Sequence, residues 1–177
     1  YCSISGFGQE SNEPGYDLMV QGLSGIPSIT GTGDPLKCGA SIADLVAGMN
    51  AVQGILAALY QREVSGQGSS VDVSMLDGQL SLLTYHASAW LNGQKAPMPL
   101  GNAHPSIHPF RAYRTQDSYL NLAIGNDRLF EQFCVRFQLD WHLDERFATN
   151  ARRVENRAAL NEQLGPFFLR RTTSCLL

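Results

Sequence analysis

The sequence predicts an α/β protein in two parts. Strand-like and helix-like segments follow one another through the first half of the 177 residues, in the order strand, helix, helix, strand, helix. This order is typical of layered α/β domains rather than helical bundles. A proline-rich stretch near residue 100 precedes a second, shorter run of strands and helices. Because 44% of the residues are hydrophobic, the chain can bury a core of ordinary size.

The first half begins with a short strand in YCSIS, which runs into a glycine turn. PGYDLMVQGLSG predicts a helix, because Pro14 stands near its start and Gly25 can end it. SITGTGDPLK predicts a loop. Apolar residues then cover most of the helical circumference from Ile42 to about Glu63, which predicts a long, buried helix. SGQGSS predicts a turn, VDVSML a strand, and Leu76–Leu91 another helix.

The second half is predicted to be a smaller α+β domain. Prolines and turn residues predict a linker at residues 96–108, between a first domain of residues 1–95 and a second of residues 109–177. FRAYRT and YLNLAI predict a β-hairpin, and Asp127–Phe137 and Arg152–Leu164 predict amphipathic helices. A last helix is predicted to begin at Thr172 or Thr173. Because a strand is predicted at the first residues and a helix start at the last ones, we expect a fragment of a longer protein.

Composition argues against several classes of protein. The net charge of −3 and the pI near 5.8 favour neither nucleic acid nor a membrane surface as partner. Four widely spaced cysteines without a C-x-x-C pair argue against a zinc site and a disulfide scaffold, and are typical of reduced thiols in a cytoplasmic protein. Polar residues interrupt every apolar run before the length of a membrane span is reached, and the sequence contains no signal peptide. No metal-ligand spacing is present.

Asp44 is the most informative single residue, because it stands in the first turn of an otherwise apolar helix. Ser41 followed by Asp44 resembles a capping box, and a carboxylate there gains roughly 0.3–1 kcal/mol from the helix dipole. The same dipole favours the ionised carboxylate. In apolar surroundings that carboxylate is poorly solvated and can attack an acyl carbon. Spacing alone favours the cap, and the two roles are compatible.

Other polar residues have an ordinary interpretation beside a functional one. Tyr16 and Asp17 are expected to be a half-buried tyrosine and a helix-start acid. His104 and His108 lie in a proline-restrained loop, where they are either surface residues or contacts for an anionic ligand.

Arginines near these histidines also have two interpretations. Arg111 and Arg114 are placed on one face of the next strand, where they bind a carboxylate or pair with Asp117. The arginines of FATNARRVENRAAL predict a solvated helix face with i,i+3 and i,i+4 ion pairs.

Several stretches, taken in order, resemble the family III CoA-transferases, which include formyl-CoA transferase, carnitine CoA-transferase and α-methylacyl-CoA racemase. Within the family the likeness is to dicarboxylate CoA-transferases of the succinyl-CoA:glutarate type. The matching stretches are YCSISGFGQ, PGYDLMVQGLSGIPSITG, ASIADLVAGMNAVQGILAALYQRE, SGQGSSVDVSMLDGQLSLL, GNAHPSIHPF and DERFATNARRVENRAAL.

The resemblance implies a fold and a reaction. Residues 1–95 would be part of a Rossmann-like large domain, followed by a smaller domain, in a homodimer of interlocked chains. The family's catalytic aspartate falls on Asp44. It would carry CoA as an aspartyl-CoA thioester between an acyl-CoA donor and a carboxylic acid acceptor. The resemblance implies CoA thioesters as substrates, with no metal and no prosthetic group.

Three functional hypotheses follow. The first is a CoA-transferase in which Tyr16, Gln21, His104, His108 and Arg111 are candidate contacts for substrate or CoA. The second is a racemase or epimerase of α-methylacyl-CoA. Tyr16 argues against it, because the racemase branch has a histidine there and a tyrosine exchanges protons poorly at neutral pH. The third is an inactive or assembly-only fragment. Relative to the family, the loop ESNEPGYD is short, and AHPSIHPF lacks the glycine run of a flexible lid.

Overall fold

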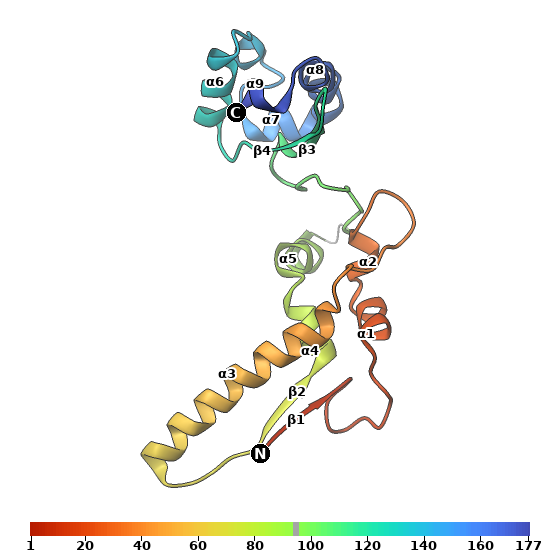
Figure 1. Ribbon diagram of the computed structural model, residues 1–177, viewed down its shortest axis with the longest axis vertical. Helices are drawn as coiled ribbons and strands as arrows, with labels where there is room; N and C mark the ends of the chain where they lie inside the picture. The colour runs from red at the N-terminus through yellow and green to blue at the C-terminus, as the bar shows by residue number, and fades with distance from the viewer. Residues whose placement is uncertain (94–95) are drawn as a thin grey trace. The chain divides into compact units, whose positions relative to one another are not determined.

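The chain folds into two compact units, Tyr1–Pro99 and Leu100–Leu177, in a computed structural model that describes residues 1–93 and 96–177 (Figure 1). The predicted end of the first domain at residue 95 lies outside the described residues. Residues 100–108, which we predicted as linker, belong to the second unit. Helices and strands mix in both units, as the α/β prediction requires.

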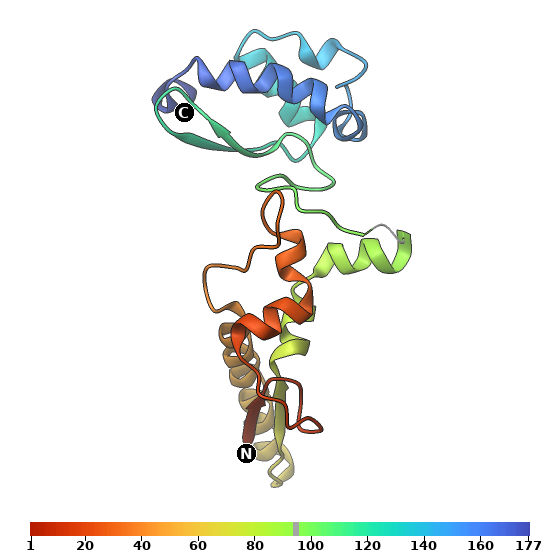
Figure 2. The same ribbon diagram turned by 90° about the vertical axis from the view of Figure 1, so that its right-hand side faces the viewer.

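The first unit is built on a short parallel pair of strands. Strand β1 (Cys2–Ser5) lies beside β2 (Val71–Ser74), with Cys2 opposite Val71 and Ser5 opposite Ser74. The connection between them contains helix α3 (Ile42–Ser65), which contacts both strands and lies along them in Figures 1 and 2. Parallel strands need such a crossover, and a helix is its usual form. The predicted strands and long helix are therefore confirmed.

Shorter helices surround the start of α3. Helix α1 (Asp17–Ser24) ends at Gly25, whose φ of 81° is the left-handed conformation that glycine adopts readily. Helix α2 (Ile26–Ile29) extends into the predicted loop. The single helix predicted at Leu76–Leu91 is instead two, α4 (Met75–Ser81) and α5 (Thr84–Gly93). Thr84, with φ of 41°, starts the second one in a conformation that interrupts a regular helix.

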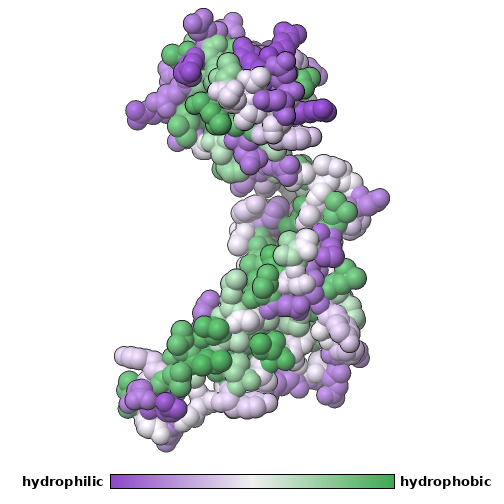
Figure 3. Space-filling view, viewed as in Figure 1, coloured by the Kyte–Doolittle hydropathy of each residue, from purple (hydrophilic) through white to green (hydrophobic). Residues whose placement is uncertain are grey.

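Helix α3 is not buried as the sequence predicted. A stripe of small residues, Ala43, Ala47 and Ala51, contributes to the core of the unit, together with Val20, Val73 and Met75. The larger apolar residues lie outside this stripe, and Met49 and Leu56 are 59% and 61% exposed. Green, apolar residues accordingly gather over α3 in Figure 3. The two-stranded sheet is too narrow to cover more than one side of the helix.

By length and composition alone, α3 could cross a membrane, with a mean hydropathy of 1.6 over its 18-residue window. Core helices of globular domains meet the same criteria, and the alanine stripe of α3 packs against the rest of its unit. The absence of a membrane partner stays a prediction.

Two glycines of α3 give a matched pair of substitutions. A Cβ added to Gly54 would lie 2.6 Å from Cγ1 of Val71 on β2, whereas one added to Gly48 would meet no atom within 4 Å. Gly48→Ala is expected to stabilise the protein by about 1 kcal/mol, since alanine favours the helix. Gly54→Ala is expected to lose that gain and destabilise by about 1–3 kcal/mol, because the Val71 side chain must turn or its strand must move. Urea unfolding of both variants tests this difference. A Gly54→Ala variant as stable as Gly48→Ala would contradict the close contact between helix and strand.

The second unit is a hairpin packed with helices. Strands β3 (Phe110–Arg114) and β4 (Tyr119–Ala123) pair antiparallel, as predicted, and helix α8 (Arg157–Leu169) contacts β3. Helix α6 (Asp127–Arg136) is confirmed, and α9 (Thr173–Leu176) begins where a helix start was predicted. The predicted helix Arg152–Leu164 is divided at Asn156 into α7 (Asn150–Glu155) and α8 (Arg157–Leu169). A short 3-10 helix, η1, spans Trp141–Leu143.

The core of the second unit is largely aromatic. Phe133, Phe137 and Trp141 surround Phe167, with ring centroids 5.2–5.7 Å from its own. Such edge and offset contacts add to the stabilisation from buried area. The buried core residues are Tyr113, Ile124, Phe130, Cys134, Phe147, Leu160, Leu164, Phe167 and Phe168.

Candidate functional site

The start of α3 is capped by a residue of another helix. Ser41, the N-cap residue, makes no side-chain capping bond, so the predicted Ser41–Asp44 capping box is wrong. Instead, the backbone N–H of Ala43 donates to Oδ1 of Asp17, the first residue of α1, at 3.0 Å. The carboxylate of Asp17 thus occupies the N-terminal end of α3, where unpaired N–H groups favour negative charge.

Gln21 extends this contact to the loop that precedes α3. Its Nε2 donates to Oδ2 of Asp17 at 2.8 Å, and its Oε1 accepts from the N–H of Cys38 at 2.8 Å. The Gln21 side chain is fully buried, and its amide spans α1 and the loop. The structure therefore gives Gln21 a part in holding the loop. Direct contact between Gln21 and substrate stays a prediction.

Asp44 lies next to Ala43, in the first turn of α3. Its side chain is exposed, and its carboxylate makes no hydrogen bond or ion pair within residues 1–93 and 96–177. The poorly solvated environment expected from the sequence is therefore not present in this chain. Because Asp17 supplies the cap, the Asp44 carboxylate is left available for a reaction.

Tyr16 is the N-cap residue of α1 and immediately precedes Asp17. We expected it to be half-buried, but it is 68% exposed. Helix α1 and its N-cap therefore contain Tyr16, Asp17 and Gln21, and the helix contacts the Asp44 turn through Asp17. A ligand site around Asp44 would need this arrangement.

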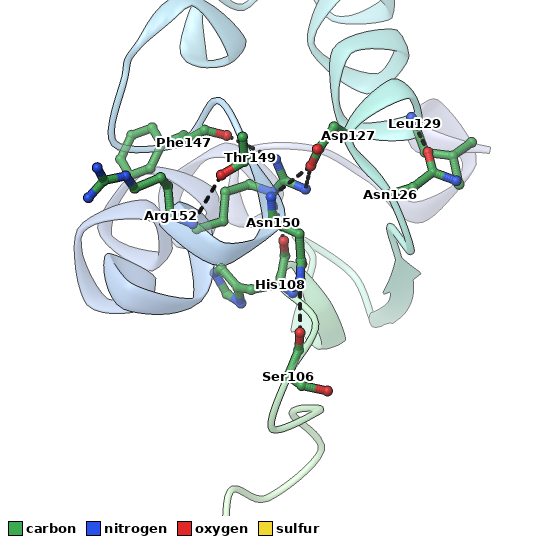
Figure 4. A network of polar contacts seen from close by, with 10 residues as sticks. Ser106, His108, Asn126, Asp127, Leu129, Phe147, Thr149, Asn150 and Arg152 are labelled. Carbon is green, nitrogen blue, oxygen red and sulfur yellow. Dashed lines mark hydrogen bonds and ion pairs between the residues drawn. The ribbon is translucent and has the colours of Figure 1, made fainter.

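A second polar network holds the segment that contains His104 and His108 (Figure 4). Arg153 is fully buried, and its guanidinium donates to the backbone oxygens of His108 and Phe147 and to Oδ1 of Asp127, at 2.8–2.9 Å. Asn150 accepts from the N–H of His108 and donates to the oxygen of Ser106. The segment is thereby fixed to the second unit.

These contacts correct our interpretation of the arginine-rich stretch. Arg152 does form the expected exposed i,i+3 pair with Glu155, at 3.3 Å. Arg153, however, points inward, with its guanidinium carbon 4.4 Å from the centroid of the Phe130 ring. A solvated helix face therefore describes only part of this stretch. Helical period alone does not distinguish an inward arginine when its partners lie far away in sequence.

The candidate anion contacts of the second unit have different environments. Nδ1 of His104 accepts from the N–H of Ser106 at 3.2 Å. His108 is fully buried, and neither ring nitrogen has a hydrogen-bond partner among the described residues. Nη2 of Arg157 donates to the backbone oxygens of His104 and Pro105 at 2.9 and 3.0 Å, which adds a further anchor to the segment.

Arg111 and Arg114 do not share a face, because a spacing of three residues places them on opposite sides of β3. Arg111 is partly buried, whereas Arg114 is exposed. Asp117 is not paired with either within the described chain. It accepts instead from the hydroxyl of Thr115 and from the N–H of Thr173. Arg111 therefore stays a candidate for binding a carboxylate, on the same face as Tyr113.

The buried His108 predicts a pH-dependent stability. Burial, followed by the charges of Arg157, Arg111 and Arg153, lowers its pKa to about 4. The unfolded chain, with a pKa near 6.5, takes up the proton first as the pH falls. The stability that depends on neutral His108 is therefore fully present above about pH 6.5 and is lost progressively towards pH 4.

We expect His108→Leu to remove this loss, so that between pH 7 and pH 4.5 the wild type loses about 2 kcal/mol more than the variant. Urea unfolding at both pH values measures it. If the free energy of unfolding changed equally with pH in the two proteins, His108 would be protonated as easily in the folded state as in the unfolded state.

Two further observations bear on ligands. Among the described residues, no group of three or more His, Cys, Asp or Glu side chains is placed to hold a metal ion. A pocket of about 290 Å³ in the first unit is lined by Ile29 of α2, Trp90 of α5 and Leu83, which precedes α5, among others, and Asp44 is not among its lining residues.

Comparisons with known proteins identify relatives of the whole chain. The family model of CoA-transferase family III matches residues 1–177. A succinate–glutarate CoA-transferase of Agrobacterium fabrum is 40% identical over 168 residues, which cover 92% of this chain and 42% of that protein. An acetyl-CoA:oxalate CoA-transferase of Acetobacter aceti is 40% identical over 171 residues, covering 93% and 44%. The crystal structure of a CaiB/BaiF family protein from Brucella suis superposes with a TM-score of 0.81 at 37% identity, covering 99% of this chain and 48% of that one.

The chain thus spans less than half the length of these relatives. Because the family match nevertheless runs from its first residue to its last, as the sequence motifs predicted, the chain belongs to CoA-transferase family III.

Proposed function

We propose that this chain is part of a CoA-transferase that moves CoA from an acyl-CoA donor, such as succinyl-CoA, to a carboxylic acid acceptor. The names of its relatives support CoA transfer in general. One relative is named for succinate and glutarate, and another is named for oxalate. One observation of the chain itself carries the proposal: Asp44, an exposed carboxylate with no partner among the described residues, stands at the N-terminal end of an apolar helix. A dicarboxylic acid is the acceptor class we favour.

The proposed reaction is a series of acyl transfers through Asp44. Its carboxylate attacks the thioester carbonyl of the donor, giving a mixed anhydride and CoA thiolate. The thiolate attacks the aspartyl carbonyl, which releases the donor acid and leaves an aspartyl-CoA thioester. The acceptor carboxylate attacks this thioester, giving a second mixed anhydride and thiolate. Attack of the thiolate on the acceptor carbonyl yields the new acyl-CoA and restores Asp44. No step changes an oxidation state.

The local structure supports these roles. The N-terminal end of α3 favours the carboxylate form of Asp44, which is the nucleophile. Because Asp17 holds the N–H of Ala43, Asp44 need not turn back to cap its own helix. In the second unit, His104 and Arg111 are proposed as contacts for a substrate carboxylate, and the contacts of Arg153 and Arg157 hold the segment of His104 in place.

The assembly is part of the same proposal. The exposed apolar residues of α3 are proposed to be covered in the whole protein by the remainder of a Rossmann-like large domain, within an interlocked, cytoplasmic homodimer. Exposed leucine, methionine and valine side chains along α3 support a partner surface of this kind.

Hydroxylamine trapping tests the covalent step. The full-length protein is incubated with succinyl-CoA and treated with hydroxylamine, which converts an aspartyl thioester or anhydride to a hydroxamate. Peptide mass spectrometry is expected to place the hydroxamate on Asp44, and acceptor added before the trap is expected to diminish it. A hydroxamate on another residue, or its absence during active turnover, would overturn the proposal.

A further inference from the structure

Asp17 and Asp44 are two carboxylates at one helix end, but only one of them bonds to it. Oδ1 of Asp17 accepts from the N–H of Ala43, the second residue of α3, at 3.0 Å. Asp44, the third residue, leaves its carboxylate without a partner in the described chain. In a capping box, the acid at the third helical position reaches back to the N–H of the N-cap residue, while the N-cap side chain accepts from an N–H of the first turn. Here Asp17, rather than Ser41, accepts from that first turn.

We infer that Asp17 is a positioning residue: by capping α3 from α1, it keeps the Asp44 carboxylate free of the helix end and directed towards substrate. The inference rests on the proposed nucleophilic role of Asp44. It adds that the cap and the nucleophile are separate residues, where the sequence suggested that a single short motif supplied both.

The surroundings of Asp17 show that its carboxylate is oriented on both sides. Oδ2 accepts from Nε2 of Gln21 at 2.8 Å, while Oδ1 faces Ala43. Gln21 and Ala43 are each fully buried, whereas the Asp17 carboxylate that joins them is partly exposed. Gln21 is fixed in turn by the N–H of Cys38, at 2.8 Å. The carboxylate therefore has one orientation, and the first turn of α3 is set relative to α1.

The bonds of Asp17 with Ala43 and Gln21 predict different effects for two substitutions of Asp17. Asp17→Ala removes the carboxylate that accepts from the N–H of Ala43. Asp44 then supplies the nearest carboxylate for that unpaired N–H. Asp17→Asn keeps an amide oxygen for Ala43 but presents its NH₂ to the NH₂ of Gln21. Either the two NH₂ groups repel each other, or the Gln21 amide turns and its oxygen no longer accepts from the N–H of Cys38. The alanine variant is therefore expected to be the more impaired, and the asparagine variant to recover part of the activity.

The test uses the full-length protein with succinyl-CoA and glutarate as probe substrates. For Asp17→Ala, kcat is expected to fall about ten- to a hundred-fold while KM for succinyl-CoA stays within about three-fold, because binding is retained and the attack is misaligned. Asp17→Asn is expected to lie between Asp17→Ala and the wild type. Hydrogen exchange at the Ala43 amide is expected to accelerate in Asp17→Ala. Asp77→Asn is the matched control, since Asp77 is an exposed first-turn acid on α4, and its kinetics are expected to match the wild type.

The outcomes separate the inference from the proposal beneath it. If Asp44→Ala is inactive but Asp17→Ala keeps the wild-type kcat per folded molecule, the positioning role is refuted and the nucleophile stands. If Asp17→Ala lowers only the melting temperature, Asp17 is merely structural and the inference fails. If Asp44→Ala itself remains active, the proposed function fails first.

Discussion

Replacing Asp44 by asparagine in the full-length protein is expected to abolish CoA transfer while leaving the fold intact. An amide does not form the anhydride, so we expect kcat to fall at least about a thousand-fold, as when other catalytic nucleophiles are removed. The carboxylate of Asp44 makes no bond in the described chain, so its loss removes only the helix-dipole term of roughly 0.3–1 kcal/mol.

An assay for glutaryl-CoA measures the expected loss of transfer, and a thermal melt measures whether the fold is retained. Asp44→Ala serves as a second variant, because it has no amide that can hydrolyse back to the acid. Asp77→Asn again provides the control for a first-turn acid on a neighbouring helix. If either Asp44 variant retained more than about a tenth of the activity, the nucleophile would have to be another residue.

Arg153→Met is expected to produce the largest loss of stability, about 3–5 kcal/mol in the second unit. The buried guanidinium satisfies the oxygens of His108 and Phe147, and each unpaired carbonyl costs about 1–3 kcal/mol. The ion pair with Asp127 contributes less, because that carboxylate is 54% exposed. Methionine fills much of the volume but offers no donor.

Arg152→Met is the matched control for this substitution. It is adjacent in sequence, and its 3.3 Å pair with Glu155 is exposed on both sides, so we expect a change within about 0.5 kcal/mol. Urea unfolding, followed by tryptophan fluorescence from Trp141 in the same unit, measures both variants. Similar stabilities for Arg152→Met and Arg153→Met would show that the segment from Ser106 to His108 is held by other contacts.

Local sequence signals predicted most of the elements. Alternation predicted β1, β2 and the hairpin, and Gly25 and Thr173 marked a helix end and a helix start. The breaks at Leu82–Leu83 and Asn156 were missed, because the apolar pattern continues through both and no proline or glycine marks them. The burial of α3 was overestimated because periodicity shows which residues are apolar and gives no information on whether a partner covers them.

The sequence identified a candidate nucleophile, but it did not identify the residues that hold the start of α3 and the His108 segment. Asp44 was singled out by its position and by the family motifs, and its role stays a proposal. Asp17 caps a helix that begins 25 residues later, and Arg153 reaches His108 across 45 residues. Such contacts depend on the tertiary fold, and no spacing rule in one sequence identifies them.

The claim that Asp44 carries the acyl and CoA groups is tested most directly by oxygen transfer. In the proposed reaction, one oxygen of the acceptor carboxylate remains on the aspartate when the second anhydride is broken by thiolate. The full-length protein is therefore given succinyl-CoA and ¹⁸O-labelled glutarate, and the peptide that contains Asp44 is analysed by mass spectrometry after turnover. We predict ¹⁸O in the Asp44 carboxylate and in no other acidic side chain. Formation of glutaryl-CoA without ¹⁸O in Asp44 would contradict the account.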